Sequence, residues 1–267
     1  MTGAPTQAER GERFRKLHEG ESFVIPNPWD AGSARVLQAL GFQALATTSS
    51  GFAFTLGRLD GGTTLDEVGE HVRALTEASS LPLSVDLENG YGPDPADAAT
   101  AITRAADAGA VGGSIEDYDP SGDIYEPGHA AERVAAAVEA ARALDFPFTL
   151  TARAENHIRG NPDLDDTIAR LHSYEQAGAD VLYAPGLHDP GDIRRVCEAV
   201  SKPVNVLALP GMTMEQLVEA GAQRVSVGGS LAFVAAAALA AAAEQIRDEG
   251  DFSALAVRVP LRDWLSP

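Results

Sequence analysis

The chain has 267 residues, of which 45% are hydrophobic and 22% are charged. It is long and apolar enough to form one large domain or two small ones, which excludes a disordered tail and a collagen-like repeat. Its 20 basic and 39 acidic residues give a formal net charge of −19, which repels phosphate backbones and anionic membrane surfaces. We therefore expect no nucleic-acid partner and no membrane association.

Individual residue types exclude further kinds of site and of cellular location. Cys197 is the only cysteine, so the chain forms no internal disulfide and no cysteine-based zinc site. Residues 1–20 lack the apolar core of a signal peptide, and no uncharged apolar stretch of about 18 residues follows them. These features predict a soluble, cytoplasmic protein.

Short apolar segments alternate with longer, alanine-rich ones along the chain. The expected strands cover residues 23–26, 44–48, 83–87, 111–116, 148–153, 181–184, 204–207 and 224–227. The expected helices cover residues 31–40, 65–79, 95–108, 130–144, 163–177, 189–199, 213–220 and 230–248. Eight strand–helix repeats in about 250 residues favour a closed, parallel (β/α)8 barrel over an open sheet. Since no linker-like segment interrupts the alternation, residues 1–267 are expected to form one domain.

Acidic residues lie at the carboxyl ends of the third and fourth expected strands, at the barrel face where chemistry is found in this fold. Asp86 and Glu88 are two residues apart on a strand and therefore point to the same side. Two such carboxylates repel each other unless a cation lies between them, and oxygen-only ligands favour Mg²⁺ or Mn²⁺. Glu116 supplies a third acid for the same ion. The alternative is a solvated strand end without metal.

Later strand ends carry candidates for substrate contacts. Arg153, at the end of the fifth strand, is a bidentate donor for a substrate carboxylate, or an ion-pair partner of Glu116 or Glu155. His157 follows it and is a candidate for proton transfer. Asn205, in the seventh strand, is a candidate hydrogen-bond partner of the substrate.

Loops after the second and last strands provide further candidates. Residues 47–52 combine hydroxyls with a glycine, so they form either a carboxylate-binding turn of backbone amides or a plain turn. Asp60 lies in a glycine-rich loop. Residues 228–230, Gly-Gly-Ser, form either a phosphate-binding loop or a tight turn. The remaining helical histidines are expected at the surface: His18, His71, His129 and His172.

The segments 27–30, 86–92, 115–117, 151–155 and 228–230, in this order, resemble the isocitrate lyase/phosphoenolpyruvate mutase superfamily. The most specific of them, Asp-Leu-Glu-Asn-Gly-Tyr-Gly at 86–92, looks like the metal segment D-x-[DE]-x-GYG of that family. The resemblance implies a (β/α)8 barrel that uses Mg²⁺ to hold a 2-keto acid or an enolate. It also implies a last helix that packs on a neighbouring subunit, usually in a tetramer.

The resemblance also assigns roles to single residues. Asp86, Glu88 and Glu116 take the metal-site positions, directly or through water. Ser50 and Gly51, with Phe52 beside them, take the carboxylate-binding position. Asp60 matches a site acid, and Arg153 matches the substrate arginine.

The sequence departs from the family at the leaving-group end of the site. The lid segment of the lyases contains a lysine and a proton-donating cysteine, whereas residues 117–128 here contain neither. Thr48 stands where the lyases have a tyrosine, and Ala184-Pro185-Gly186 stand where many have a glutamate. Tyr118, Tyr125 or His157 would have to replace the missing proton donor.

These features predict a Mg²⁺-dependent lyase that cleaves a C–C bond of a small 2-keto or 2-hydroxy di- or tricarboxylate through a metal-stabilised enolate. Oxaloacetate decarboxylation and 2-methylisocitrate cleavage are the two examples considered. Alternatives are P–C bond chemistry on phosphonopyruvate, which the missing lid lysine disfavours, and a non-catalytic 2-keto acid binder. A homo-oligomer, either a tetramer or a dimer, is expected, and residues 231–243 either pack on another subunit or cover their own barrel.

Overall fold

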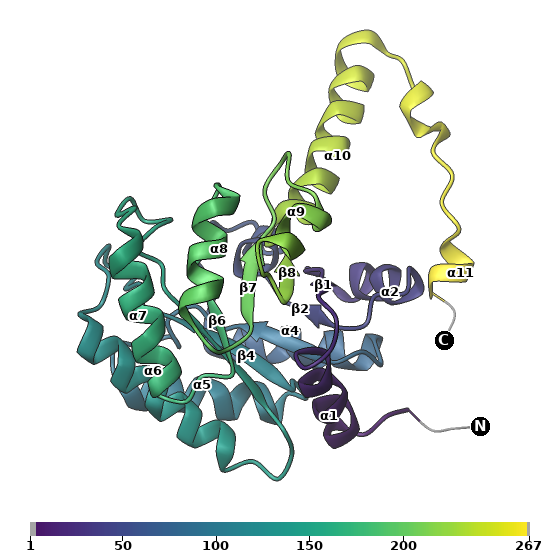
Figure 1. Ribbon diagram of the computed structural model, residues 1–267. Helices are drawn as coiled ribbons and strands as arrows, with labels where there is room; N and C mark the ends of the chain where they lie inside the picture. Colours follow the sequence, from purple (N-terminus) through teal and green to yellow (C-terminus); the bar gives the residue numbers. More distant parts are fainter. Residues whose placement is uncertain (1–3, 266–267) are drawn as a thin grey trace.

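The computed structural model describes residues 4–265, and its eight strands form one parallel sheet (Figure 1). The strands are β1 Phe23–Ile25, β2 Leu45–Ala46, β3 Leu83–Asp86, β4 Gly112–Glu116, β5 Thr149–Arg153, β6 Val181–Tyr183, β7 Val204–Leu207 and β8 Arg224–Ser226. Their order is β1-β8-β7-β6-β5-β4-β3-β2, and each neighbouring pair is parallel. The predicted (β/α)8 barrel is confirmed.

The barrel closes between β1 and β2 through individual hydrogen bonds. The backbone amide of Ala46 donates to the carbonyl of Pro26 at 3.1 Å. The Asn27 side chain donates to the carbonyl of Thr47 at 3.0 Å and accepts from the amide of Val227 at 3.0 Å. Asn27 therefore joins the ends of β1, β2 and β8 at the functional face.

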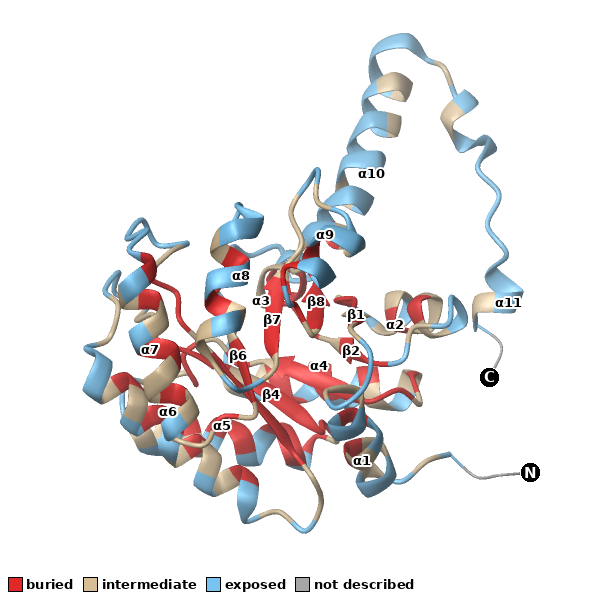
Figure 2. Ribbon diagram, in the orientation of Figure 1, coloured by how far each residue is buried: buried red, intermediate tan, exposed pale blue. Residues whose placement is uncertain are grey.

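Helices follow the strands around the barrel much as the sequence predicts. They are α2 Ala31–Ala39, α4 Leu65–Ala78, α5 Pro95–Asp107, α6 Pro127–Arg142, α7 Leu164–Gln176, α8 Pro190–Ala199, α9 Met214–Glu219 and α10 Ser230–Glu249. Figure 2 shows the strands as the buried centre of the molecule and the helices as half-exposed elements around them.

Two helices that the sequence did not predict precede and interrupt this series. Helix α1, Gln7–Leu17, begins at a capping box formed by Thr6 and Glu9, and it buries only Gly11 and Phe14. A helix with so few apolar residues gives almost no periodic signal. Helix α3, Ser49–Thr55, follows β2 directly, where the sequence suggested a turn.

Helix α1 covers the amino-terminal end of the barrel. Phe14 packs there in a cluster with Phe23, Ile25, Ala44 and Val111. A Cβ at residue 112 would lie 2.7 Å from the Phe14 ring, so this close contact requires glycine.

Two histidines are not exposed: His71 is buried and His18 is half-buried, so the prediction of a surface position for them was wrong. His18 contacts the rings of Phe14 and Phe23 edge-on, with centroid distances of 4.8 and 5.2 Å. His71 stacks on Phe52 at 4.0 Å. His18 caps the carboxyl end of α1 and His71 lies in α4, and both rings turn toward apolar neighbours, which a count of polar residues does not reveal.

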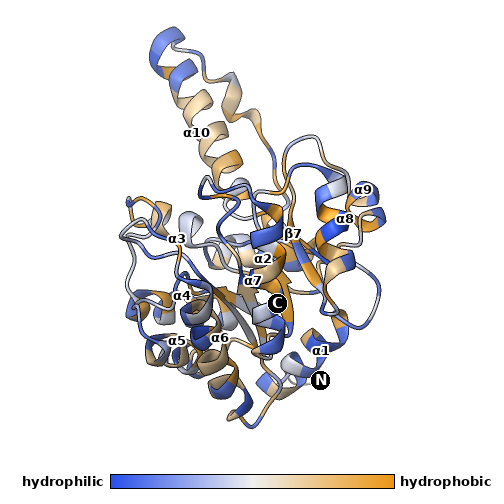
Figure 3. Ribbon diagram, turned by 60° about the vertical axis from the view of Figure 1, so that its left-hand side comes forward, coloured by the Kyte–Doolittle hydropathy of each residue, from blue (hydrophilic) through white to orange (hydrophobic). Residues whose placement is uncertain are grey.

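Helix α10 projects from the barrel, and the chain returns through η1, Ser253–Ala256, to α11, Leu261–Leu265, beside α2 (Figure 1). Of its residues only Ala232 is buried, while Phe233, Val234 and Leu239 are 49%, 65% and 70% exposed. Figure 3 shows that much of this projecting helix is apolar. The alternative that it covers its own barrel is therefore wrong.

Length and composition alone would also allow α10 to cross a membrane, as they do for no other helix in residues 4–265. A single helix that meets those two criteria is weak support for a membrane span. Exposed apolar patches of this kind often mark interaction sites.

Candidate active site

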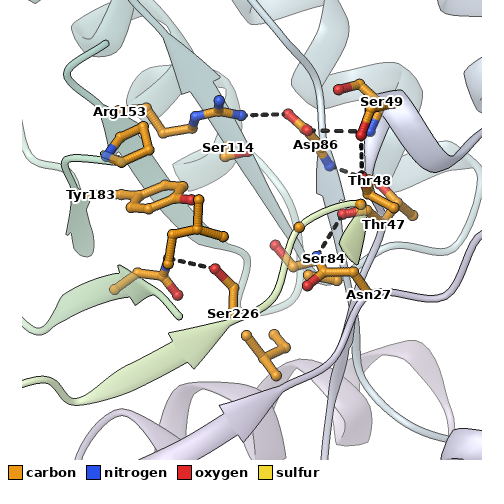
Figure 4. Close-up of a pocket in the computed structure, with 18 of the residues that line it drawn as sticks. Asn27, Thr47, Thr48, Ser49, Ser84, Asp86, Ser114, Arg153, Tyr183 and Ser226 are labelled. Carbon is orange, nitrogen blue, oxygen red and sulfur yellow. Dashed lines mark hydrogen bonds and ion pairs between the residues drawn. The ribbon is translucent and has the colours of Figure 1, made fainter. Parts of the chain in front are cut away.

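Two adjoining cavities open at the carboxyl ends of the strands. The inner cavity enters the barrel, and its polar lining comes from most of the strands (Figure 4). The outer cavity lies beside it and is lined by Glu88, Glu116, Tyr118 and Arg159, among others. Ser49, Asp60 and Arg153 line both cavities.

Arg153 lies at the boundary between the two cavities, at the end of β5. Its guanidinium contacts carboxylate oxygens of Asp86 at 2.8 Å, Glu116 at 2.9 Å and Glu155 at 2.7 Å. Burial alone would lower the pKa of Arg153, but Glu116, Glu155 and Asp86 together raise it well above its usual value. The alternative of an ion pair with Glu116 or Glu155 is confirmed, and Arg153 in fact pairs with both and remains fully charged.

The carboxylates around Arg153 are themselves buried. The side chains of Glu116 and Glu155 are only 7% and 1% exposed. Burial raises the pKa of Glu116 well above its usual value, although Arg153 opposes that shift. A second cation, Arg159, lies 3.8 Å from Glu116 and 3.2 Å from Glu155.

Glu88 reaches the outer cavity by a route that the sequence pattern did not predict. Strand β3 ends at Asp86, and Glu88 has a φ of +50°, so strand alternation does not place the two carboxylates on one side. A left-handed backbone at Glu88 turns it toward Tyr91, whose hydroxyl donates to it at 3.1 Å. Burial, and then repulsion from Asp86, raise the pKa of Glu88 to about 7.

The acidic group fits a hydrated magnesium ion better than a closed metal cage. Within residues 4–265, no three acidic, histidine or cysteine side chains already form a ligand group. Asp86 and Glu116 face Arg153, while Glu88 faces Tyr91. Mg²⁺ usually keeps several waters and uses one or two carboxylates, and a cation would relieve the repulsion that raises the pKa of Glu88. The metal assignment of Asp86, Glu88 and Glu116 stays a prediction that these oxygen donors fit.

The segment after β2 forms the first turn of α3 rather than an open loop. Thr48 caps this helix, and its hydroxyl accepts from the amide of Gly51 at 3.4 Å. The amide of Ser49 donates to Asp86 at 3.3 Å. Ser50 lines the inner cavity, whereas Gly51 and Phe52 are not among the described residues that line either cavity.

The other site residues predicted from the sequence lie at different places relative to the two cavities. Asp60 is exposed and lines both cavities. His157 is not among the described lining residues, and its buried Nδ1 has no hydrogen-bond partner there. Asn205 is the second residue of β7 rather than a strand end, so it lies deep in the inner cavity.

Glycine in the loop after β8 permits a close approach to Ser50. A Cβ at Gly229 would lie 2.5 Å from the Ser50 hydroxyl oxygen. The structure thus gives this loop a packing role at the cavity wall, while its suggested phosphate-binding role stays a prediction.

The lid segment after β4, residues 117–128, is held in place by a β-bridge and side-chain hydrogen bonds. Tyr118 pairs with Ile124 in an antiparallel bridge. The Tyr125 hydroxyl donates to Asp119 at 2.9 Å and accepts from Asn89 at 3.0 Å, outside the described lining of both cavities. Tyr118 does line the outer cavity, with Arg159 at 3.7 Å from its ring centre.

Among the inner-cavity residues that the sequence did not single out are Tyr183 and Arg224. Tyr183 ends β6, and Arg224 begins β8. A signal was present for each: a polar aromatic residue at the carboxyl end of a barrel strand, and a charge inside an otherwise apolar strand.

A family profile and a similar protein of known name both relate this chain to the same family. The phosphoenolpyruvate phosphomutase family profile matches residues 14–247. The 2-methylisocitrate lyase of Halalkalibacterium halodurans is 30% identical over 256 residues, which cover 92% of this chain and 84% of that protein.

Solved structures show the same fold. A Burkholderia cenocepacia J2315 protein, provisionally called a lyase/mutase, is 52% identical, with a TM-score of 0.93 over 97% of this chain and 95% of that one. Phosphonopyruvate hydrolase in complex with oxalate and Mg²⁺ is 20% identical and has the same fold, with a TM-score of 0.84 over 96% of this chain and 92% of that one.

Members of the superfamily depend on Mg²⁺, and the family and its relatives' names point to a carbon–carbon lyase. The family match spans most of the barrel and both acidic strand ends, Asp86 and Glu116. The chain belongs to the isocitrate lyase/phosphoenolpyruvate mutase superfamily.

Proposed function

We propose that this protein is a Mg²⁺-dependent lyase that cleaves a C–C bond of a small 2-keto or 2-hydroxy di- or tricarboxylate through an enolate. The observation that carries the proposal is the acidic group around Arg153 at the mouth of the inner cavity. Asp86, Glu88 and Glu116 would hold the ion, directly or through water. When bound, Mg²⁺ would polarise the carbonyl of a 2-keto acid and stabilise negative charge on its oxygen.

The protein's own groups would orient the substrate. Arg153 keeps its charge and lies where the two cavities meet, so it can hold a substrate carboxylate while remaining paired with Glu116. Ser50, in the first turn of α3, lines the same inner cavity. Fixing the carboxylate in this way aligns the breaking bond with the carbonyl.

Among the substrates considered, oxaloacetate fits this site best. Its decarboxylation releases neutral CO₂ and needs no general base, whereas a 2-hydroxy acid needs a base for its hydroxyl. His157, the histidine proposed from sequence for proton transfer, does not line the described cavities. Cleavage of 2-methylisocitrate is the second candidate, favoured by the similarity to a 2-methylisocitrate lyase.

Phosphonopyruvate chemistry remains an alternative because Arg159 places a cation in the outer cavity. That guanidinium is paired with Glu155 at 3.2 Å, which reduces the positive charge available to a transferring phosphoryl group. Lys202 cannot replace the lid lysine, since it lines a separate cavity with Arg15 and Arg142, at the other end of the barrel.

A proton NMR time course tests the proposal. Oxaloacetate, 2-methylisocitrate, 2,3-dimethylmalate and phosphonopyruvate are each incubated with the protein and Mg²⁺, with enzyme-free and EDTA controls. Pyruvate that forms from a carbon substrate faster than in both controls supports the lyase. Turnover of phosphonopyruvate alone would instead establish P–C chemistry. Mg²⁺-dependent binding of a 2-keto acid without any turnover would support the non-catalytic binder.

We further propose a homo-oligomer in which a second copy covers α10. Phe233, Val234 and Leu239 are exposed on this projecting helix, and the net charge of −19 disfavours an anionic membrane surface as the cover. Light scattering should give the mass of a dimer or tetramer, and Leu239→Glu should shift it toward the monomer. A wild-type monomer that binds neutral vesicles would contradict this proposal.

A further inference from the structure

The substrate of the proposed lyase carries at least two carboxylates, and the metal end of the site, with Arg153, accounts for one of them. In the part of the chain that the structure describes, three cations line the two cavities: Arg153, Arg159 and Arg224. Arg153 contacts three carboxylates, and Arg159 is paired with Glu155 at 3.2 Å. Arg224 forms no ion pair within residues 4–265, so its charge is available to a second carboxylate.

Uncharged groups hold the Arg224 guanidinium in place. Its Nε donates to Oδ1 of Asn205 at 2.8 Å, and its Nη2 donates to Oγ1 of Thr151 at 2.9 Å. Its Nη1 lies 3.2 Å from Nε2 of His18, which must accept because an arginine only donates. Nδ1 of His18 then donates to the carbonyl of Phe14 at 2.9 Å, so this histidine is neutral. Among the described residues these contacts leave one N–H bond on each terminal nitrogen of Arg224 for a ligand.

Arg224 is a buried charge without a counterion. The residue is only 5% exposed, and although burial lowers its pKa to about 10, it stays charged at neutral pH. Removing an unpaired charge from water is costly. An anion bound beside Arg224 would offset that cost, so the floor of the inner cavity favours an anionic group.

Arg224 reaches a deeper level of the barrel than Arg153. Its partner Thr151 lies two residues before Arg153 on β5, which corresponds to about 7 Å along the strand. A ligand with carboxylates at both ends of a four-carbon chain matches this separation of levels. Oxalate, whose two carboxylates are directly bonded, is too short to occupy both.

Small polar side chains line the path between the two levels. Branched apolar side chains usually fill the interior of such a barrel, whereas Ser84, Ser114 and Ser226 line the cavity here. Figure 4 shows Ser84 and Ser226 below Arg153 and Asp86. The wall between mouth and floor therefore suits a carboxylate better than an apolar group.

We propose, building on the proposed function, that Arg224 forms a subsite at the cavity floor for the second carboxylate of the substrate, the one that the metal end does not hold. The two remaining N–H bonds of its terminal nitrogens donate to the carboxylate oxygens. The subsite selects 2-keto or 2-hydroxy acids that end in a carboxylate over those that end in a methyl group.

The subsite acts on substrate binding more than on the chemical step. If the substrate is oxaloacetate, the C3–C4 bond breaks, its electron pair enters the enolate, and the carboxylate leaves Arg224 as neutral CO₂. If the substrate keeps its second carboxylate, the ion pair is the same before and during bond cleavage. In both cases Arg224 stabilises the bound substrate at least as much as the transition state, so its loss should raise KM rather than lower kcat.

Calorimetry in the presence of Mg²⁺ tests the subsite with a matched pair of ligands. Malate and 2-hydroxybutanoate differ only in that a methyl group replaces one carboxylate of malate. The wild type should bind malate at least about 10-fold more tightly, as expected for hydrogen bonds to a charged group. Oxalate serves as the reference ligand for the metal end.

Two variants remove the free charge at the floor in different ways. Arg224→Gln removes the cation, whereas Asn205→Asp keeps it and places a carboxylate at the 2.8 Å contact. Both should reduce the preference for malate to about threefold or less, while the oxalate affinity stays within about threefold of the wild type. If Arg224→Gln does not fold, Asn205→Asp decides the question, because it gives the buried cation a counterion.

Lys16→Gln is the matched control. It changes the net charge by the same amount, its side chain is 65% exposed on α1, and it lies outside the described lining of both cavities. This variant should keep the full preference for malate. On the carbon substrate that the wild type turns over fastest, the two floor variants should raise KM about 10-fold or more and lower kcat by at most about threefold.

Two results would overturn the inference: a wild type that binds malate no more tightly than 2-hydroxybutanoate, or floor variants that keep the wild-type preference. A purely structural Arg224 would give the second result together with a lower melting temperature in Arg224→Gln. Failure of the proposed function appears elsewhere, as a wild type that turns over none of the substrates. The preference for malate is measured by binding alone, so the two failures are distinguishable.

Discussion

Two arginines line the same inner cavity, but their surroundings differ. Arg153 contacts three carboxylates: Asp86, Glu116 and Glu155. Arg224 hydrogen-bonds only uncharged groups in the part of the chain that the structure describes: Asn205, Thr151 and His18. Burial lowers the pKa of Arg224 to about 10, whereas the carboxylates raise that of Arg153.

Because Arg153 has carboxylate partners and Arg224 has only uncharged ones, the two ends of the cavity differ in charge. At the mouth, Asp86, Glu88 and Glu116 outnumber their cations, so this end favours a divalent ion. At the floor, Arg224 carries a positive charge without a counterion, which favours an anionic substrate and orders the hydrogen bonds around it. One end of the cavity therefore suits a metal, and the other suits an anion.

The largest expected effect is on the stability of the acidic mouth. Arg153→Met would leave Glu116 and Glu155 buried without their nearest cation, which typically costs about 3–5 kcal/mol of unfolding free energy. Urea denaturation of the ligand-free protein measures it. Arg159→Gln is the control, since that side chain is 38% exposed and should cost at most about 1 kcal/mol.

Removing a carboxylate should affect ligand binding more than folding. Asp86→Ala is expected to abolish Mg²⁺-dependent oxalate binding, a loss of at least about 100-fold. Calorimetry with and without Mg²⁺ measures the change. Unaltered binding in a folded Asp86→Ala protein would rule out the metal assignment at this position.

Arg224 provides the matched comparison with Arg153. Arg224→Met leaves Asn205 and Thr151 without a donor but no carboxylate without a cation, so it should cost about 1–3 kcal/mol. The same urea experiment applies. If Arg224→Met lost as much unfolding free energy as Arg153→Met, the two ends of the cavity would not differ in their counter-charges.

Much of the fold and part of the site could be predicted from the sequence. The strand–helix alternation and the acids at 86 and 116 follow local patterns that one sequence displays. The predicted alternation of Asp86 and Glu88 on one strand was wrong, because the strand ends at Asp86 and a left-handed turn follows. The hydrogen bonds from Arg224 to Asn205 and Thr151 join strands far apart in sequence, so no local pattern contains them.

The most gradual expected effect is a pH dependence at the amino-terminal end of the barrel, which α1 covers. Nε2 of His18 accepts from Arg224 at 3.2 Å, so His18 must be neutral, and burial lowers its pKa to about 3. Between pH 6.5 and about 3 the unfolded chain binds the extra proton, so stability is lost as pH falls through that range. The expected slope is about 1 kcal/mol per pH unit.

His18→Gln should flatten this slope while retaining a polar contact with Arg224. Thermal denaturation at a series of pH values measures it. An equally steep acid loss in the variant would assign the effect to other groups, such as buried His71.

The most direct test of the two-ended cavity is calorimetric titration of the wild-type protein with oxalate in the presence and absence of Mg²⁺. The account predicts that oxalate binds measurably only when Mg²⁺ is present, because the acidic mouth repels an anion until a cation neutralises it. Equal affinity in EDTA would contradict the account and would mean that the arginines alone hold the anion.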